Sequence, residues 1–107
     1  MKVLYLSLKK RWFDMISSGI KKEEYREINE YWTKRLVVSE PNNLLDDDIV
    51  FSVFDCIEFS LGYPAADDMS RRIRYEFKGI RKSYGNPAWG AEPEKEYYVI
   101  SIGERLS

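Results

Sequence analysis

The stretch SGIKKEEYREI, residues 18–28, is dense in charged side chains. It is flanked by Ile20 and Ile28, and this pattern predicts a strand despite the charge. On strict alternation, charged side chains fall on both faces, so neither is an ordinary core face. Such a strand gains little from burial. Its polar groups must be satisfied by neighbouring strands or must face a cleft that holds water or a ligand.

Lys21 and Glu24 are three residues apart, so on a regular strand they point to opposite faces. For both to line one cleft, the chain must be bulged or still turning after Gly19, and we predict this irregularity. Glu24 and Arg26 share a face, which is equally typical of an internal ion pair that fastens the strand. The alternative for Lys21 is a solvated strand lysine.

Upstream of this stretch, the pattern indicates a strand followed by a helix. Residues 2–9 alternate, with apolar side chains on both faces at the start, as expected of a buried strand. Residues 9–19 place apolar side chains at spacings of three and four and end at Gly19, a residue suited to a helix C-cap. Residues 30–37 predict one or two helical turns. Loops are predicted at residues 39–50, 62–70 and 83–95.

The C-terminal half predicts further strands. RRIRYEFKGI, residues 71–80, has the clearest alternation, with Tyr75 and Phe77 in the core. Residues 49–61 predict one long bent strand or two short ones, and residues 96–103 predict the last strand.

The fold class that follows is mainly β (α+β), in one domain spanning residues 1–107. Five or six strands with one or two short helices and no βαβ repetition favour a small closed or nearly closed β-barrel. Closure removes sheet edges that otherwise aggregate.

Composition excludes several kinds of chemistry. The chain has one cysteine, Cys56, and no histidine, which rules out an intramolecular disulfide, cysteine-based zinc sites and Ser-His-Asp or Cys-His nucleophiles. Cys56 lies in a predicted strand and is expected to be a small buried hydrophobe. We expect no metal and no cofactor.

The apolar stretch at the beginning of the chain is too short and too polar for a signal peptide. No apolar run is long enough to span a membrane. We therefore expect a cytoplasmic protein without a membrane partner. The net charge of −1 argues against coating of nucleic acid through bulk electrostatics. Charge is segregated, however. Residues 36–70 carry eight acids and no base, whereas residues 71–82 carry six bases against Glu76.

Gly19, Lys21, Glu24 and Arg26 match the pattern G-x-K-x-x-E-x-R. This pattern, after a strand and a short helix and before YWTKRL and a late WGAEPEKEYYVI, resembles the ASCH domain family, a branch of the PUA-like barrels. The resemblance extends over nearly the whole chain.

The resemblance implies a compact β-barrel with a cleft beside the motif that holds RNA or a nucleobase. Some members of the family are amidohydrolases that deacylate a modified cytidine with the motif lysine, a threonine and a later glutamate. Lys21 matches the lysine, but Glu24 stands where those enzymes have threonine, which counts against a hydroxyl-dependent mechanism. Glu58 and Glu76, both on predicted strands, are the candidates for the later glutamate.

Other side chains are further candidates for binding RNA or a base. Trp32, Lys34 and Arg35 combine a stacking surface with positive charge, which suits an unstacked base, although packing and solvated charge explain them equally. Ser7 and Lys9 approach the motif if the first and second strands are neighbours. A separate candidate, Trp89 in the late loop, is expected to be core covering a barrel end, with a lid as the alternative. The candidate ligand-binding residues are Ser7, Lys9, Lys21, Glu24, Arg26, Trp32, Lys34 and Arg35, with Lys21 and Glu24 also the catalytic candidates.

Three functions remain open. The first is a module that binds RNA or a modified nucleoside through the cleft. The second is a hydrolase for an acylated cytidine, in which Lys21 and an acid polarise the amide and activate water. The third is a protein-interaction domain in which the many aromatic residues form a contact patch.

Overall fold

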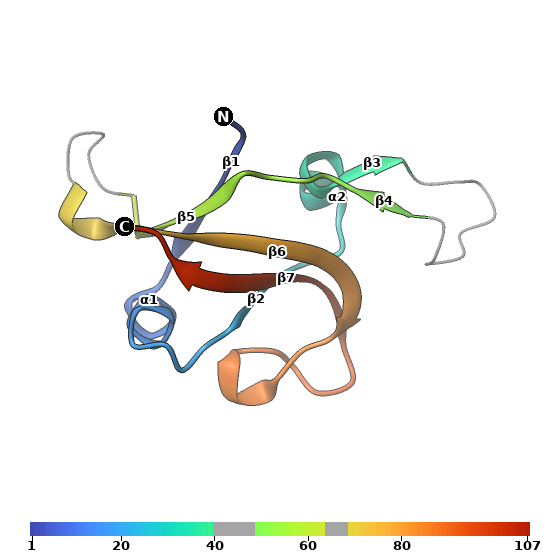
Figure 1. The fold of residues 1–107 in the computed structure, drawn as a ribbon. Coiled ribbons are helices and arrows are strands. Elements are labelled where there is room, and N and C mark those ends of the chain that lie inside the picture. Colours follow the sequence, from blue (N-terminus) through green and yellow to red (C-terminus); the bar gives the residue numbers. More distant parts are fainter. Residues whose placement is uncertain (40–48, 64–68) are drawn as a thin grey trace.

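The computed structural model describes residues 1–39, 49–63 and 69–107. Within these ranges, one five-stranded sheet has the order β1-β5-β6-β7-β2, and β3 pairs with β4 in a small second sheet (Figure 1). The strands are β1 (Val3–Leu8), β2 (Glu23–Arg26), β3 (Val37–Ser39), β4 (Val50–Phe51), β5 (Cys56–Leu61), β6 (Arg72–Tyr84) and β7 (Glu96–Arg105). The helices are α1 (Lys10–Ser17) and α2 (Glu30–Leu36), with 3-10 turns η2 (Met69–Arg71) and η3 (Pro87–Trp89).

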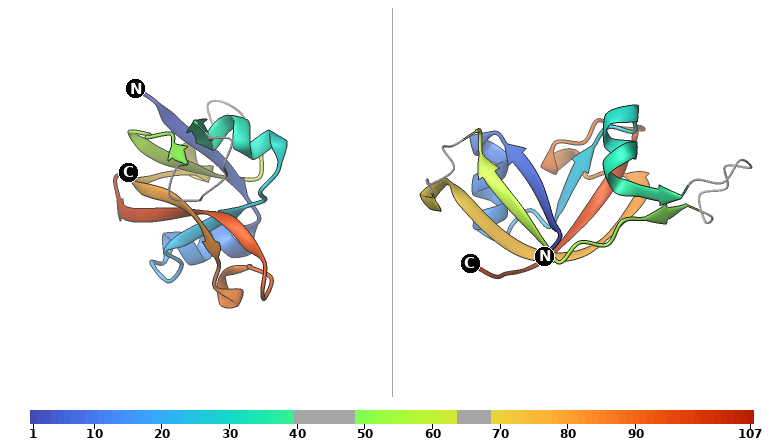
Figure 2. Two further views of the ribbon diagram at one scale, coloured as in Figure 1. Left: turned by 90° about the vertical axis from the view of Figure 1, so that its right-hand side faces the viewer. Right: turned by 90° about the horizontal axis from the view of Figure 1, so that it is seen from above.

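The five-stranded sheet curls into a half-barrel, which confirms the expected small, mainly β architecture. β1 runs parallel to β5, and the other neighbours in the sheet are antiparallel. The pairing of β6 with β7 shifts register on either side of Phe77, and Gly79 in the second shift has φ +115°. Irregularities of this kind bend a strand. Figure 2 shows the long strands curving around a trough, with α1 and α2 at opposite ends of it.

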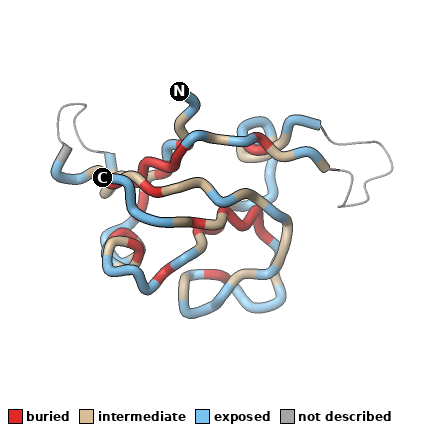
Figure 3. The backbone as a smooth tube through the Cα atoms, in the orientation of Figure 1, coloured by how far each residue is buried: buried red, intermediate tan, exposed pale blue. Residues whose placement is uncertain are grey.

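The core lies on the concave side of the sheet. Leu4, Leu6 and Leu8 of β1 are buried, whereas Tyr5 between them is exposed, so β1 is covered on one face and not on both as expected. Tyr75 is buried and Phe77 packs against the same core, as predicted. Figure 3 shows buried stretches on β1, in the middle of the sheet and at both α-helices. The core consists of Leu4, Leu6, Leu8, Phe13, Ile16, Leu36, Ile57, Phe59, Ile73, Tyr75, Tyr98, Ile100 and Ile102.

The end of α1 follows from its sequence. Gly19 has φ +84°, its N–H donates to the carbonyl of Ile16 (3.0 Å), and the N–H of Ile20 donates to the carbonyl of Met15 (3.0 Å). These two bonds form a Schellman motif, the cap that a glycine at this position favours. The predicted helix and its stop are therefore confirmed, with the last helical residue at Ser17.

Several element boundaries differ from the sequence pattern. The predicted strand 20–28 is shorter and comprises only Glu23–Arg26. Residues 49–61, for which the sequence allowed one long strand or two short ones, contain the two short strands β4 and β5. The sequence pattern did not predict β3. The predicted loops at 39–50 and 62–70 lie largely outside the described residues. Cys56 is buried in β5, as expected.

In the part of the chain that the structure describes, neither α-helix has the length and apolar character that crossing a membrane requires.

Candidate functional site

The chain is still turning when it reaches Lys21. The N–H groups of Ile20 and Lys21 both donate to the carbonyl of Met15 at 3.0 Å, and regular pairing of β2 begins only at Glu23. Lys21 therefore precedes the strand, and its Nζ lies 2.9 Å from Glu24 Oε1. The predicted irregularity is confirmed, and it brings the two side chains together.

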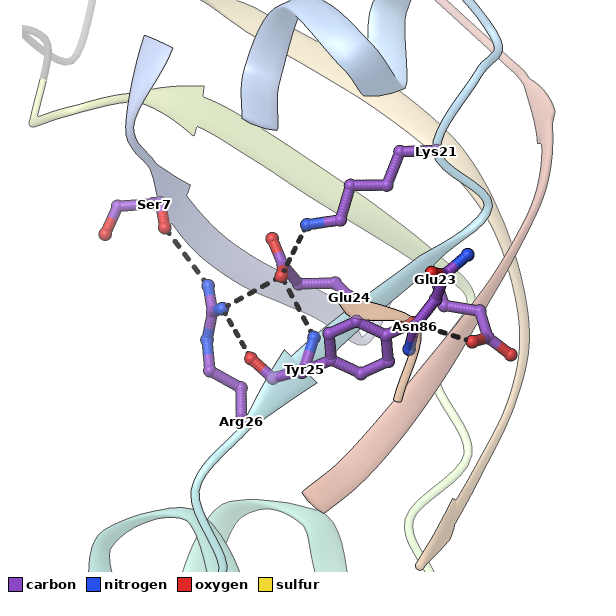
Figure 4. Close-up of polar contacts among 7 residues, drawn as sticks. All are labelled: Ser7, Lys21, Glu23, Glu24, Tyr25, Arg26 and Asn86. Atoms are coloured by element: carbon purple, nitrogen blue, oxygen red, sulfur yellow. Dashed lines mark hydrogen bonds and ion pairs between the residues drawn. The ribbon is translucent and has the colours of Figure 1, made fainter. Parts of the chain in front are cut away.

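Glu24 is the centre of the polar cluster, and its side chain is only 6% exposed. Oε1 accepts the Lys21 bond and the backbone N–H of Tyr25 (2.9 Å), and Arg26 Nη1 lies 3.5 Å away. Figure 4 shows Lys21 and Arg26 converging on this carboxylate from different sides. Oε2 is buried and has no hydrogen-bond partner among the described residues. A buried carboxylate oxygen gains from a hydrogen-bond donor, so Oε2 is a candidate acceptor for a ligand.

Lys21 is enclosed by protein. Its Nζ lies 4.8 Å from the centre of the Trp12 ring and 5.8 Å from that of Tyr25. Burial lowers the pKa of Lys21, because removal from water disfavours the ammonium, while the charge and hydrogen bond of Glu24 oppose the shift. The pair thus combines a lysine with a lowered pKa and a carboxylate of which one oxygen has no hydrogen-bond partner within residues 1–39, 49–63 and 69–107.

Arg26 links β2 to the other edge of the sheet. Its Nη2 donates to the carbonyl oxygen of Ser7 on β1 (3.1 Å), and its Nη1 donates to that of Tyr25 (3.0 Å). The guanidinium lies 5.2 Å from the centre of the Trp32 ring, within range of a cation–π contact. Ser7 and the motif are therefore neighbours, although β1 and β2 are not paired as strands in the described residues.

Tyr25 fastens the loop that follows β6. Its hydroxyl donates to Glu23 Oε1 (2.9 Å) and accepts the backbone N–H of Asn86 (2.9 Å). Burial, with smaller contributions from Glu23 and Glu24, raises the pKa of Tyr25 to about 12. This bond holds the Asn86 end of the loop that carries Trp89 against β2.

A cleft of about 390 Å³ opens at this junction. We call it the seam cleft because it lies where β1 and β2, the outer strands of the sheet, approach each other. Of the predicted site residues, it brings together Ser7, Lys9, Glu24, Arg26 and Trp32. Its other lining residues are Leu8, Trp12, Tyr25, Glu27, Trp89, Gly90, Glu92 and Tyr97.

Lys34 and Arg35, two of the candidate ligand-binding residues, do not line the seam cleft. Lys34 is exposed and pairs with Glu30 at 2.9 Å, one turn earlier on α2. Arg35 donates to the carbonyl of Tyr31 (2.9 Å) and stacks on its ring. Arg35 and Trp32 line a separate depression together, whereas Lys34 lies on the exposed surface of α2.

Neither later glutamate meets the motif lysine. Glu58 pairs with Arg72 (3.1 Å) and Arg74 (3.0 Å) on β6, the strand next to its own. Glu76 accepts the backbone N–H of Glu104 (2.9 Å). The carboxylate beside the lysine is instead the one within the motif itself.

Of the aromatic residues that line the cleft, the sequence identifies only Trp32 as a stacking surface. Trp12 belongs to the apolar spacing of residues 9–19, and Trp89 is expected to be core, with a lid as the alternative. Trp89 does pack against the small cluster around Tyr25 and Tyr97, but it also borders the cleft. The turn at Asn86, whose side chain accepts the N–H of Ala88 (3.0 Å), was the signal that this loop has a fixed shape.

No three His, Cys, Asp or Glu side chains gather as a metal site within residues 1–39, 49–63 and 69–107. The cleft brings charged side chains of both signs together with aromatic rings.

No protein-family model matches the chain, and neither a curated protein nor a solved structure matches it significantly. What the site can do therefore follows from its own geometry and charge.

Proposed function

We propose that the seam cleft binds a nucleobase, presented by RNA or by a modified nucleoside. The observation that carries this proposal is Glu24 Oε2, a buried acceptor with no donor among the described residues, in a side chain that lines a cleft walled by tryptophans. An exocyclic amine or ring N–H of a base supplies such a donor, and glutamate pairs with the amine of cytosine in this way.

Aromatic side chains support a flat ligand. Trp32, Trp89 and Tyr97 reach the cleft from three separate elements, α2, η3 and β7. Stacking on such rings is the usual way in which proteins hold an unpaired base. A cleft of about 390 Å³ lies within the range of ordinary small-molecule sites.

The charges and rings of the cleft suit a neutral ligand. Arg26 lies over Trp32 and Lys95 over Tyr97, at 5.2 Å from each ring centre, so both rings already contact positive charge. The lining carries side chains of both signs, two bases and three acids. A neutral heterocycle that donates to Glu24 and stacks on a ring needs no counter-charge of its own.

Hydrolysis of an acylated cytidine is the second candidate. The observation in its favour is the lowered pKa of Lys21, which is the direction that proton transfer near neutral pH requires. Lys21 is not part of the cleft wall, however, and its Nζ is engaged by Glu24. Recognition without turnover is therefore the function that the geometry supports best.

Titration of the tryptophan fluorescence with cytidine, uridine, adenosine and guanosine tests base binding. We expect saturable quenching by at least one nucleoside and an affinity about tenfold weaker in Glu24→Gln, because an amide replaces the carboxylate acceptor. Glu76→Gln is the matched control, since that carboxylate lies outside the cleft. Trp89→Leu provides a second variant that leaves the buried ion pair intact.

Absence of quenching by all four nucleosides, or equal affinities of Glu24→Gln and Glu76→Gln, contradicts the proposal. In a parallel reaction, N4-acetylcytidine is incubated with the protein and followed by mass. Turnover that disappears in Lys21→Ala assigns the hydrolase function instead.

A further inference from the structure

A second depression of about 390 Å³ lies across β1 from the seam cleft. We call it the tyrosine groove, because Tyr5, Tyr31 and Tyr63 line it while remaining 62%, 54% and 94% exposed. Large aromatic rings that gather around a concavity without being buried mark an interaction site more often than a folding need. The seam cleft makes no use of these three rings.

The tyrosine groove is continuous with the seam cleft. Ser7, Arg26 and Trp32 line both depressions, so Trp32 is a wall common to the two. A ligand that extends beyond a single base therefore has an aromatic surface directly adjoining the first one.

A third depression, of about 460 Å³, adjoins both and carries the positive charge. We call it the basic hollow. It shares Lys9 with the seam cleft and Tyr63 with the tyrosine groove, and its lining includes Lys10 and Arg71. It is lined by Ser7, Leu8, Lys9, Lys10, Leu61, Gly62, Tyr63 and Arg71, with no carboxylate among them.

The cations of the basic hollow differ in how they are engaged. Lys10 pairs with Asp14, but Lys9 and Arg71 have no ion pair among the described residues. The seam cleft, in contrast, is lined by Glu24, Glu27 and Glu92, which repel an anion. Phosphate is therefore favoured in the basic hollow and disfavoured in the cleft.

We infer that the ligand is a single-stranded oligonucleotide that places one base in the seam cleft, a neighbouring base in the tyrosine groove and the phosphate between them in the basic hollow. This inference rests on the proposed function. All three depressions meet at Ser7, so base, phosphate and base find adjoining sites in the order in which a strand presents them. The exposed tyrosines alone also suit a protein partner, but Lys9 and Arg71, which form no ion pair within the described part of the chain, favour a polyanion.

The test compares nucleosides with the corresponding dinucleoside monophosphates, both as RNA and as DNA, by tryptophan fluorescence. We expect the dinucleotide to bind about five- to tenfold more tightly than the better of its two nucleosides, because a second base stacks. The double variant Tyr5→Ser/Tyr63→Ser loses this gain while its nucleoside affinity is unchanged. Tyr84→Ser is the matched control, since Tyr84 is equally exposed but lies at the far end of β6.

Removal of a positive charge from the basic hollow gives an independent test. Arg71→Gln is expected to weaken the dinucleotide and to reduce its dependence on salt, without affecting the nucleoside, whereas Arg105→Gln changes neither. A nucleoside that binds as tightly as the dinucleotide overturns the inference but leaves base binding standing. Self-association that is lost in the tyrosine double variant, with dinucleotide binding unchanged, assigns the groove to a protein contact and also overturns it. Absence of binding by every nucleoside and dinucleotide refutes both proposals.

Discussion

Arg26 Nη2 and the carbonyl oxygen of Ser7 are joined at 3.1 Å, although their strands stand at opposite ends of the sheet order. In a closed barrel, backbone hydrogen bonds between the two edge strands make this connection. Here a guanidinium makes it, and the space that strand pairing would otherwise fill is the seam cleft. The link that fastens the half-barrel is therefore also a wall of the site.

Arg26→Lys is expected to lower the free energy of unfolding by about 1–2 kcal/mol, because an ammonium cannot donate to two carbonyls in the fixed geometry of a guanidinium. Urea denaturation followed by fluorescence measures the loss. Arg81→Lys is a matched control, since Arg81 also bonds to β2, at Glu23, but is half-exposed. Equal losses in the two variants contradict the special role of the seam.

A double-mutant cycle on Lys21 and Glu24 is expected to be strongly non-additive. Glu24→Leu leaves a buried ammonium without its counter-charge and costs about 3–5 kcal/mol. Lys21→Met costs less, because Glu24 keeps Arg26 at 3.5 Å. The double variant is expected to be more stable than Glu24→Leu alone. Additive free energies of unfolding would show that the two groups do not interact.

The raised pKa of Tyr25 is expected to lower the free energy of unfolding at alkaline pH. Its pKa is raised to about 12 in the folded chain, so the stabilisation is fully present below the ordinary tyrosine pKa of about 10 and is lost as pH rises from there to about 12. Tyr25→Phe is expected to flatten this part of the stability curve, and the last tyrosinate to appear in an absorbance titration is expected to vanish. A titration identical to that of Tyr84→Phe contradicts the assignment.

Gly90→Ala is expected to disturb the cleft from the loop side. Gly90 has φ +101°, and a Cβ there lies 2.9 Å from Trp12 Cζ2, so the substitution strains the backbone and displaces the indole. A stability loss of about 1–3 kcal/mol should accompany weaker nucleoside binding. Gly79→Ala is the control, because its φ is +115° but its Cβ meets nothing within 4 Å. If both variants bind nucleosides like the unaltered chain, Trp12 is not part of the site.

The sequence pattern around the motif predicted part of the geometry of the site. Gly19 and the apolar spacing of residues 9–19 predicted the helix stop, and the three-residue separation of Lys21 and Glu24 required the turn that the structure contains. Trp32 and Arg35, three residues apart on α2, line one depression together, but only Trp32 also lines the seam cleft. The sequence did not reveal on which side of α2 the cleft lies.

The sequence by itself determined α1 and its stop, most of the strands and the turn that brings Lys21 to Glu24, because helix caps, alternation and residue spacing act over a few residues. Only the tertiary structure decided which aromatic rings surround Glu24. Trp12, Trp32, Trp89 and Tyr97 come from four separate elements, and they meet only because the sheet curls until its edges face each other. That curvature arises from strand twist and register shifts summed over the whole sheet, and no short stretch of sequence contains it.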